Sequence, residues 1–134
     1  MRAVCQSIGP VLRVAAASAA FAALIPSTAL AEGRPATFRA LSANGAAVAF
    51  TTAESLVPSD GDNAVDVYTR AGGVTSIASD RPSGDTTNPA AFRALSGDGS
   101  VVVFTTAESL VPSDGDTVTD VYTRAGGVTE LVSD

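Results

Sequence analysis

The chain has no histidine, no lysine and no tryptophan, and its one cysteine is Cys5. Without histidine there is no imidazole base, no histidine metal ligand and no Ser-His-Asp triad. The basic residues are eight arginines against 14 acidic residues, so the net charge is −6 and the pI is near 4.4. Phosphate binding needs clustered positive charge, so we expect no nucleic-acid partner. The 134 residues allow one domain at most.

The first 31 residues have the organisation of a secretory signal peptide. Their charges are Arg2 and Arg13, an apolar run follows over 14–25, and Ala29-Leu30-Ala31 provides a small-residue cleavage site. The apolar run is shorter than the ~20 residues that span a bilayer, which disfavours the alternative of an uncleaved anchor helix. We therefore predict a Sec-type signal peptide cleaved after Ala31, a secreted or periplasmic protein, and no membrane span after cleavage.

Cleavage after Ala31 would leave a mature chain of 103 residues with a net charge of −8 and no cysteine. Secreted chains of this size often depend on disulfides. Here stability must come from packing or from association with other chains.

The rest of the chain consists of two tandem repeats of one unit. Residues 38–80 recur at 92–134 with an offset of 54 and no gap, and 32 of the 43 positions are identical. We place the first repeat at about 36–80, a linker rich in Pro, Gly, Asp and Thr at 81–89, and the second repeat at about 90–134.

Each repeat reads as four short antiparallel strands. In the second repeat, Ser96-Gly97-Asp98-Gly99 predicts a tight turn, because Asp-Gly tolerates the positive φ that a two-residue hairpin needs, and Ser42-Ala43-Asn44-Gly45 is its equivalent in the first. Ala125-Gly126-Gly127 predicts the next turn. No helical apolar period extends over a useful length, so the fold class is all-β. The strands predicted for the second repeat are 90–96, 100–106, 120–124 and 128–133.

These repeats resemble the TolB-type, WD40-like (PD40) β-propeller repeat. The resemblance implies that each repeat is a four-stranded, β-propeller-like blade. It also implies that blades act as scaffolds for protein partners or as accessory domains of peptidases and carbohydrate-active enzymes. The residues that carry the resemblance are Ser96, Asp98, Gly99, Val102, Phe104, Asp120, Val121, Tyr122, Arg124 and Ser133, with Ser42, Asn44, Gly45, Val48, Phe50, Asp66, Val67, Tyr68, Arg70 and Ser79 in the first repeat.

Two blades are fewer than the 4–8 of a typical propeller. Repeat units bury their apolar faces against neighbours. Three alternatives follow: the chain is a fragment of a longer propeller, several copies assemble into a ring of blades, or the two sheets close on each other as a small sandwich.

Two acidic loops are the candidate metal sites. Carboxylates at positions 1, 3 and 7 of a loop are part of what a calcium ion, with six to eight oxygen ligands, requires. The alternative is structural: Asp and Gly favour turns, and their carboxylates accept bonds from local amides. The candidate calcium ligands are Asp60, Asp62, Asp66, Asp114, Asp116 and Asp120.

Other recurring residues have structural explanations. Glu54 and Glu108 occupy equivalent loops, whereas a glycosidase needs two carboxyl groups in different environments. The recurring arginines are expected to form ion pairs with acidic loops, or alternatively a row that holds an acidic partner. The recurring aromatic residues are expected in the core. The arginines are Arg39, Arg70, Arg93 and Arg124, and the aromatics are Phe50, Phe104, Tyr68 and Tyr122.

Together these features predict a non-enzymatic, β-propeller-type repeat protein that binds another protein or acts as a scaffold, without a cofactor. The partner is unidentified, and other copies of the same chain, in a homo-oligomer that completes a propeller ring, are one candidate. The alternatives are the accessory propeller portion of a secreted hydrolase and a calcium-dependent surface or adhesion module.

Overall fold

The computed structural model describes residues 33–81 and 87–133. The predicted signal peptide and most of the predicted linker lie outside these residues. The described part is all-β, with eight strands in two four-stranded antiparallel sheets and no helix. Accordingly, these residues contain no helix that is long and apolar enough to cross a membrane.

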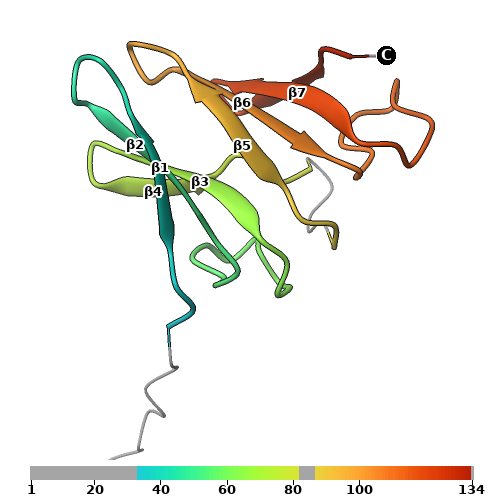
Figure 1. The fold of residues 1–134 in the computed structure, drawn as a ribbon, viewed down its shortest axis with the longest axis horizontal. Coiled ribbons are helices and arrows are strands. Elements are labelled where there is room, and N and C mark those ends of the chain that lie inside the picture. The colour runs from blue at the N-terminus through green and yellow to red at the C-terminus, as the bar shows by residue number, and fades with distance from the viewer. Residues whose placement is uncertain (1–32, 82–86, 134) are drawn as a thin grey trace, which may run out of the picture. The chain divides into compact units, whose positions relative to one another are not determined.

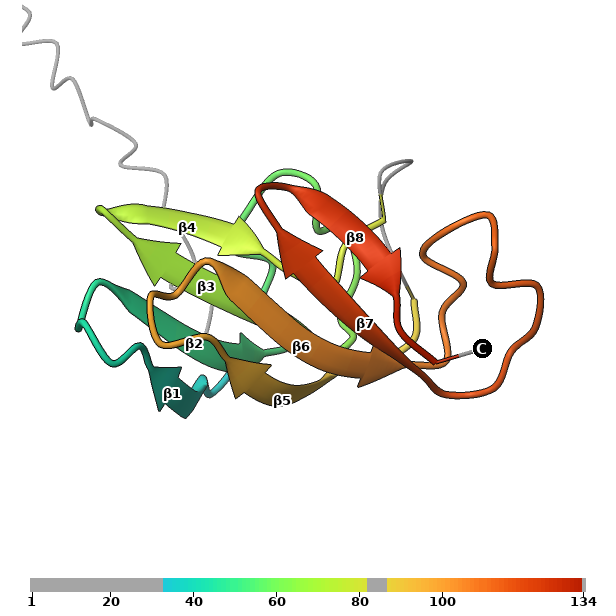
Figure 2. The ribbon, with the colours of Figure 1, turned by 90° about the horizontal axis from the view of Figure 1, so that it is seen from above.

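The two sheets follow the two repeats, and within each sheet the strands lie in chain order (Figures 1 and 2). All neighbouring strands pair antiparallel, so each sheet is a simple meander. Sheet 1 consists of β1 (Thr37–Leu41), β2 (Ala47–Thr52), β3 (Asp66–Ala71) and β4 (Val74–Ile77), and sheet 2 of β5 (Ala91–Leu95), β6 (Val101–Thr106), β7 (Asp120–Ala125) and β8 (Val128–Leu131).

The predicted strands are confirmed, with boundaries one or two residues from those expected. The β-branched and aromatic residues of β6 suit a half-buried pleated strand. The two-residue hairpins lie between β3 and β4 and between β7 and β8, where the predicted turn at Ala125-Gly126-Gly127 is confirmed. There Gly72 and Gly73 have φ of 57° and 82°, and Gly126 and Gly127 have 55° and 84°. Only a primed turn accepts two successive positive φ angles, which glycine adopts without strain.

The predicted tight turn over residues 96–99 is present, since the Gly99 N–H donates to the Ser96 carbonyl at 2.9 Å, but the loop is longer than a two-residue hairpin. Five residues separate β5 from β6, and Gly99 has a φ of 78° while Asp98 does not have a positive φ. Asp98 instead shapes the loop with its carboxylate, which accepts bonds from the hydroxyls of Ser96 and Ser100 at 2.6 and 2.8 Å and from the Ser100 N–H at 3.0 Å. In the first repeat, Asn44 accepts equivalent bonds from Ser42 and Ala46.

Each sheet has two faces, which we name by their residues. The head face of sheet 2 carries Phe92, Leu95, Val102 and Phe104, and that of sheet 1 carries their counterparts Phe38, Leu41, Val48 and Phe50. The tail face of sheet 1 carries Ala47, Ala49, Val67 and Ala78, and that of sheet 2 carries Val101, Val103, Val121 and Val132.

The sheets pack tail to head, with β5 against β1, β2 and β3. Val67 and Ala78 of the first tail face share one apolar cluster with Val102, Phe104 and Tyr122 of sheet 2. Phe92 and Leu95 pack against this cluster. The core of the described chain therefore lies largely at the junction between its two repeats.

Backbone and turn contacts hold this junction at close range. The side-chain amide of Asn44 donates to the Asp98 carbonyl at 3.3 Å, and the Ala90 N–H donates to the Val65 carbonyl at 2.7 Å. A Cβ placed on Gly99 would lie 2.5 Å from the Cβ of Ala47. Glycine is thus required at Gly99 both for its positive φ and for the approach of the first sheet.

Candidate functional site

A buried tyrosine anchors the long loop that follows the second strand of each repeat. In the first repeat, the Tyr68 hydroxyl donates to Oδ2 of Asp60 and accepts the N–H of Leu56 at 3.3 Å. The ring is fully buried and stacks on Phe50 with a centroid separation of 5.6 Å. The loop is therefore tied to the strand below it through one phenol group.

The second repeat repeats this arrangement. The Tyr122 hydroxyl donates to Oδ2 of Asp114, and its ring stacks on Phe104 at 5.8 Å. Tyr122 and Phe104 are fully buried and Phe50 is half-buried, so the expectation that the recurring aromatic residues belong to the core is confirmed. Burial is the main cause that raises the pKa of both tyrosines, and the hydrogen bond to the aspartate adds to it. Both phenols therefore stay protonated donors.

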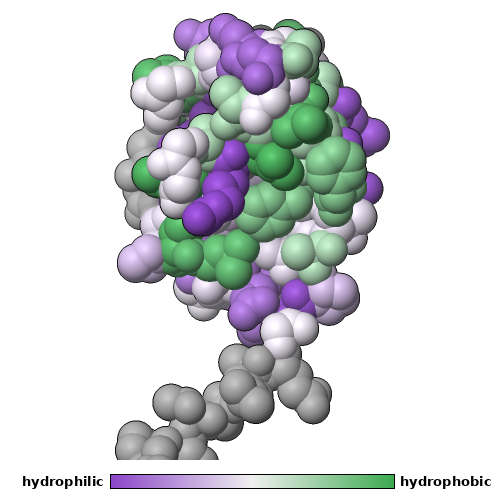
Figure 3. Space-filling model, turned by 90° about the vertical axis from the view of Figure 1, so that its left-hand side faces the viewer, coloured by the Kyte–Doolittle hydropathy of each residue, from purple (hydrophilic) through white to green (hydrophobic). Residues whose placement is uncertain are grey.

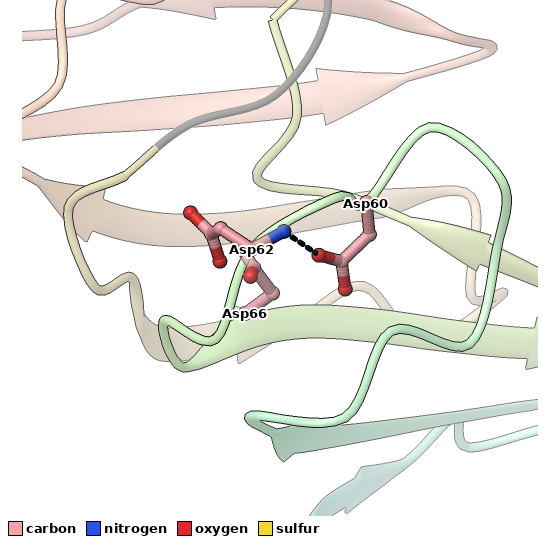
Figure 4. Close-up of side chains that lie close together, drawn as sticks. All are labelled: Asp60, Asp62 and Asp66. Atoms are coloured by element: carbon pink, nitrogen blue, oxygen red, sulfur yellow. Dashed lines mark hydrogen bonds between the residues drawn. The ribbon is translucent and has the colours of Figure 1, made fainter.

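The predicted metal ligands of the first repeat come together in space. One carboxylate oxygen from each of Asp60, Asp62 and Asp66 lies within 4.8 Å of the others (Figure 4). Asp60 and Asp66 are buried, and Asp62 is half-buried. The second repeat brings Asp114, Asp116 and Asp120 together within the same limit, but Asp116 is exposed.

Most of these carboxylate oxygens already accept local hydrogen bonds. Oδ1 of Asp60 accepts the Asp62 N–H at 3.3 Å, and Oδ1 of Asp62 accepts the Ala64 N–H at 2.6 Å. Oδ1 of Asp66 accepts the hydroxyl of Ser79 at 2.7 Å. The bonds that Asp60 and Asp62 accept from the N–H two residues further on are those of the structural alternative.

One oxygen of the first triad differs from the rest. Oδ2 of Asp62 is buried and has no hydrogen-bond partner among the described residues. A buried carboxylate oxygen normally has a partner. This atom is the part of the triad with free capacity for a cation, and calcium binding there stays a prediction.

The expectation that the two glutamates have equivalent surroundings is wrong. Glu108 is buried, forms an ion pair with Arg81 and accepts the side-chain amide of Asn88 at 2.7 Å. Glu54 is half-buried and lies beside Gly33. The partners of Glu108, Arg81 and Asn88, belong to the chain between the repeats, and the residues 54 positions before them are Ser27 and Arg34.

The recurring arginines bind threonine hydroxyls, where ion pairs with acidic loops were expected. Arg70 donates to Thr75 at 2.7 Å, and Arg124 donates to Thr129 at 2.8 Å, each across the last two strands of its sheet. Arg124 also reaches the preceding repeat and donates to the Asp80 carbonyl at 3.0 Å. Arg39 and Arg93 donate to Thr51 and Thr105.

The most conspicuous exposed surface is the head face of sheet 1. Phe38 and Leu41 are 65% and 57% exposed, although their counterparts Phe92 and Leu95 pack into the core. Leu56 is 41% exposed, whereas its counterpart Leu110 is buried. Figure 3 looks at the side of sheet 1 that faces away from sheet 2, and apolar side chains gather at its centre.

The tail face of sheet 2 is likewise left uncovered by the residues that the structure describes. Val132 is 61% exposed, while its counterpart Ala78 is 3% exposed. Val121 is half-buried, while Val67 is fully buried. The two repeats thus have nearly the same residues, and each repeat leaves open the face that the other has covered. Two packed repeats of this kind are expected to leave two outer apolar faces, but the sequence does not say which residues lie on them, because equivalent residues of the two repeats read alike.

Comparison with models of protein families, with curated proteins and with solved structures found no match.

Proposed function

We propose that this protein is a secreted, non-enzymatic repeat module of the β-propeller type, whose two open blade faces bind protein. The single observation that carries the proposal is the exposure of Phe38, which is 65% exposed where Phe92 packs into the core. The resemblance of the repeats to TolB-type blades supports the architecture, since such blades pack face to face.

The exposed apolar side chains on the open faces support a protein partner. Burying one Leu, Val or Phe side chain stabilises a protein by roughly 1.5–3 kcal/mol. Phe38, Leu41 and Leu56 leave that free energy unused on the head face, and Val132 leaves it unused on the tail face. Contiguous apolar patches on soluble chains mark interaction sites.

Photo-crosslinking in the producing cell tests this proposal. Phe38 is replaced by p-benzoylphenylalanine, and in a matched control the same group replaces Val118, a loop residue that is 66% exposed and lies on neither face. A discrete covalent adduct at position 38, absent at position 118, supports a protein-binding face. Absence of an adduct at 38, or equal labelling at both positions, contradicts it.

The same samples test the predicted processing. Intact mass spectrometry of the purified chain reads its N-terminus, and a mature chain that begins at Glu32 supports cleavage after Ala31. A chain that keeps its first 31 residues contradicts the secretory assignment.

A second candidate function, calcium binding, is favoured by one observation in the first repeat. Oδ2 of Asp62 is buried without a hydrogen-bond partner among the described residues, beside the carboxylates of Asp60 and Asp66. Asp60, Asp62 and Asp66 would hold the ion through hard oxygen ligands. In the second repeat Asp116 is exposed, so water can satisfy its carboxylate, and the first triad is the stronger candidate.

A further inference from the structure

The packing of the two repeats within one chain shows how two separate chains could pack on each other. Within one chain, the tail face of sheet 1 covers the head face of sheet 2. This leaves a head face open on sheet 1 and a tail face open on sheet 2. The open tail face of one copy is therefore complementary to the open head face of another copy.

We propose that a second copy of this chain docks its tail face, around Val121 and Val132, onto the head face around Phe38 and Leu41, in the arrangement of the internal junction. This inference rests on the proposed function, in which the open faces bind protein, and it names the partner as the chain itself.

The head faces of the two repeats are the same in sequence. Phe38 and Leu41 correspond to Phe92 and Leu95, and Val48 and Phe50 correspond to Val102 and Phe104. A surface that receives the head face of sheet 2 therefore has the chemistry to receive that of sheet 1. Gly45 has open space around it, whereas its counterpart Gly99 lies against Ala47. The loop around Gly45 therefore has space for another sheet to approach it as closely as the first sheet approaches Gly99.

The open tail face is more apolar than the covered one. Three alanines of the first tail face are replaced by valine in the second, at Val101, Val103 and Val132. The internal junction has room for a larger side chain beside Ala78, the counterpart of Val132, since this residue lines a cavity of about 260 Å³ there. A valine at this position would fill space that the alanine leaves empty.

Charge complementarity favours a second copy over other partners. Ser76 of the first tail face and Arg124 of the second head face line the same cavity at the internal junction. On the open faces, Arg70 stands in place of Arg124, and Glu130 in place of Ser76. Both Arg70 and Glu130 are exposed. Docking of two copies would bring this arginine and this glutamate together, and opposite charges steer and orient association.

A head-to-tail contact is heterologous, so it closes into a ring or extends into a filament. Rings of whole blades typically contain about 4–8 blades, which corresponds to about two to four copies of a two-blade chain. We expect a closed ring in this range.

The first experiment measures the solution mass of the full chain, in the form its host processes, by light scattering at ~10–100 µM, near the affinities of weak specific complexes. A mass of two to four copies is expected. The variants Phe38→Glu and Val132→Glu are each expected to be monomeric and folded by circular dichroism. Val118→Glu, which lies on neither face, is expected to keep the parent mass.

Mixing the two monomeric variants tests the head-to-tail geometry. Phe38→Glu keeps an intact tail face and Val132→Glu keeps an intact head face, so an equimolar mixture is expected to form a complex of one copy of each. A mixture that stays monomeric overturns the proposed geometry.

A charge swap tests the register. Arg70→Glu and Glu130→Arg are each expected to weaken association at least tenfold, and the double variant is expected to recover most of that loss. A double variant that associates more weakly than either single variant overturns the pairing.

A parent chain that is monomeric at the highest concentration overturns the whole inference. If the parent chain is monomeric but position 38 crosslinks to a different protein, the proposed protein-binding function stands and only the second-copy inference fails. If position 38 crosslinks to no protein, both the proposed function and this inference fail.

Discussion

The Tyr68 hydroxyl donates a hydrogen bond to Oδ2 of Asp60, and both residues are buried. This bond joins the third strand of the first repeat to the loop that carries the candidate metal ligands. Tyr122 and Asp114 form the same bond in the second repeat. Each loop is therefore positioned by a neutral phenol that satisfies a buried carboxylate.

Replacing Tyr68 by phenylalanine is expected to lower the free energy of unfolding by about 1–3 kcal/mol, because Asp60 loses a buried donor. Urea denaturation measures this. In an Asp60→Asn background the same replacement is expected to be less damaging, since no charge is left unsatisfied. Equal losses in both backgrounds would contradict a direct coupling between the two side chains.

Gly99 and Gly45 form a matched pair of hairpin glycines with φ of 78° and 70°. Alanine at either position is expected to cost about 1–2 kcal/mol from the positive φ. At Gly99 an added Cβ would also meet Ala47 at 2.5 Å, whereas nothing lies within 4 Å of Gly45. Gly99→Ala is therefore expected to cost about 1–3 kcal/mol more, the usual penalty of overpacking. Thermal melts at a concentration where the chain is monomeric measure the difference, and equal losses would contradict the close packing of the repeats.

The carboxyl group of Asp98 is expected to titrate at low pH. The hydrogen bond from the Ser96 hydroxyl, followed by bonds from Ser100, lowers the pKa of Asp98 from 3.8 to about 2. Because the pKa is lower in the folded state, this group stabilises the fold above pH 3.8, and its contribution is lost as the pH falls towards 2. A carboxyl NMR titration reads the pKa directly. In Ser96→Ala the pKa should rise towards 3.8, and an ordinary pKa in the parent chain would contradict these bonds.

Calcium is expected to raise the melting temperature of the full chain by at least ~4 °C at saturation, and a chelator is expected to reverse the rise. Asp62→Asn should remove the effect, because it neutralises the ligand whose oxygen has no partner among the described residues. Asp116→Asn is the matched control in the second repeat and should keep most of it. A melting temperature that responds to neither calcium nor chelator would rule out both triads.

The strands could be predicted because local residue chemistry decides them. The β-branched run of Val101–Thr106 and the Gly126-Gly127 turn specify a strand and a hairpin without reference to the rest of the fold. The acidic triads could be predicted as well, since their members are close in the chain. The tight turn over residues 96–99 could be predicted too, but its loop length could not, because the side-chain bonds from two serines that shape this loop are invisible in a dipeptide pattern.

The difference between Phe38 and Phe92 could not be predicted in this way. The two residues are the same amino acid in the same repeat context, so every local pattern assigns both to the core. Only the packing of one sheet on the other buries Phe92 and leaves Phe38 65% exposed. Local chemistry therefore determined the strands, the repeats and the acidic loops. The tertiary structure decided which faces are open, because burial depends on what lies opposite a side chain and the sequence does not state its neighbours in space.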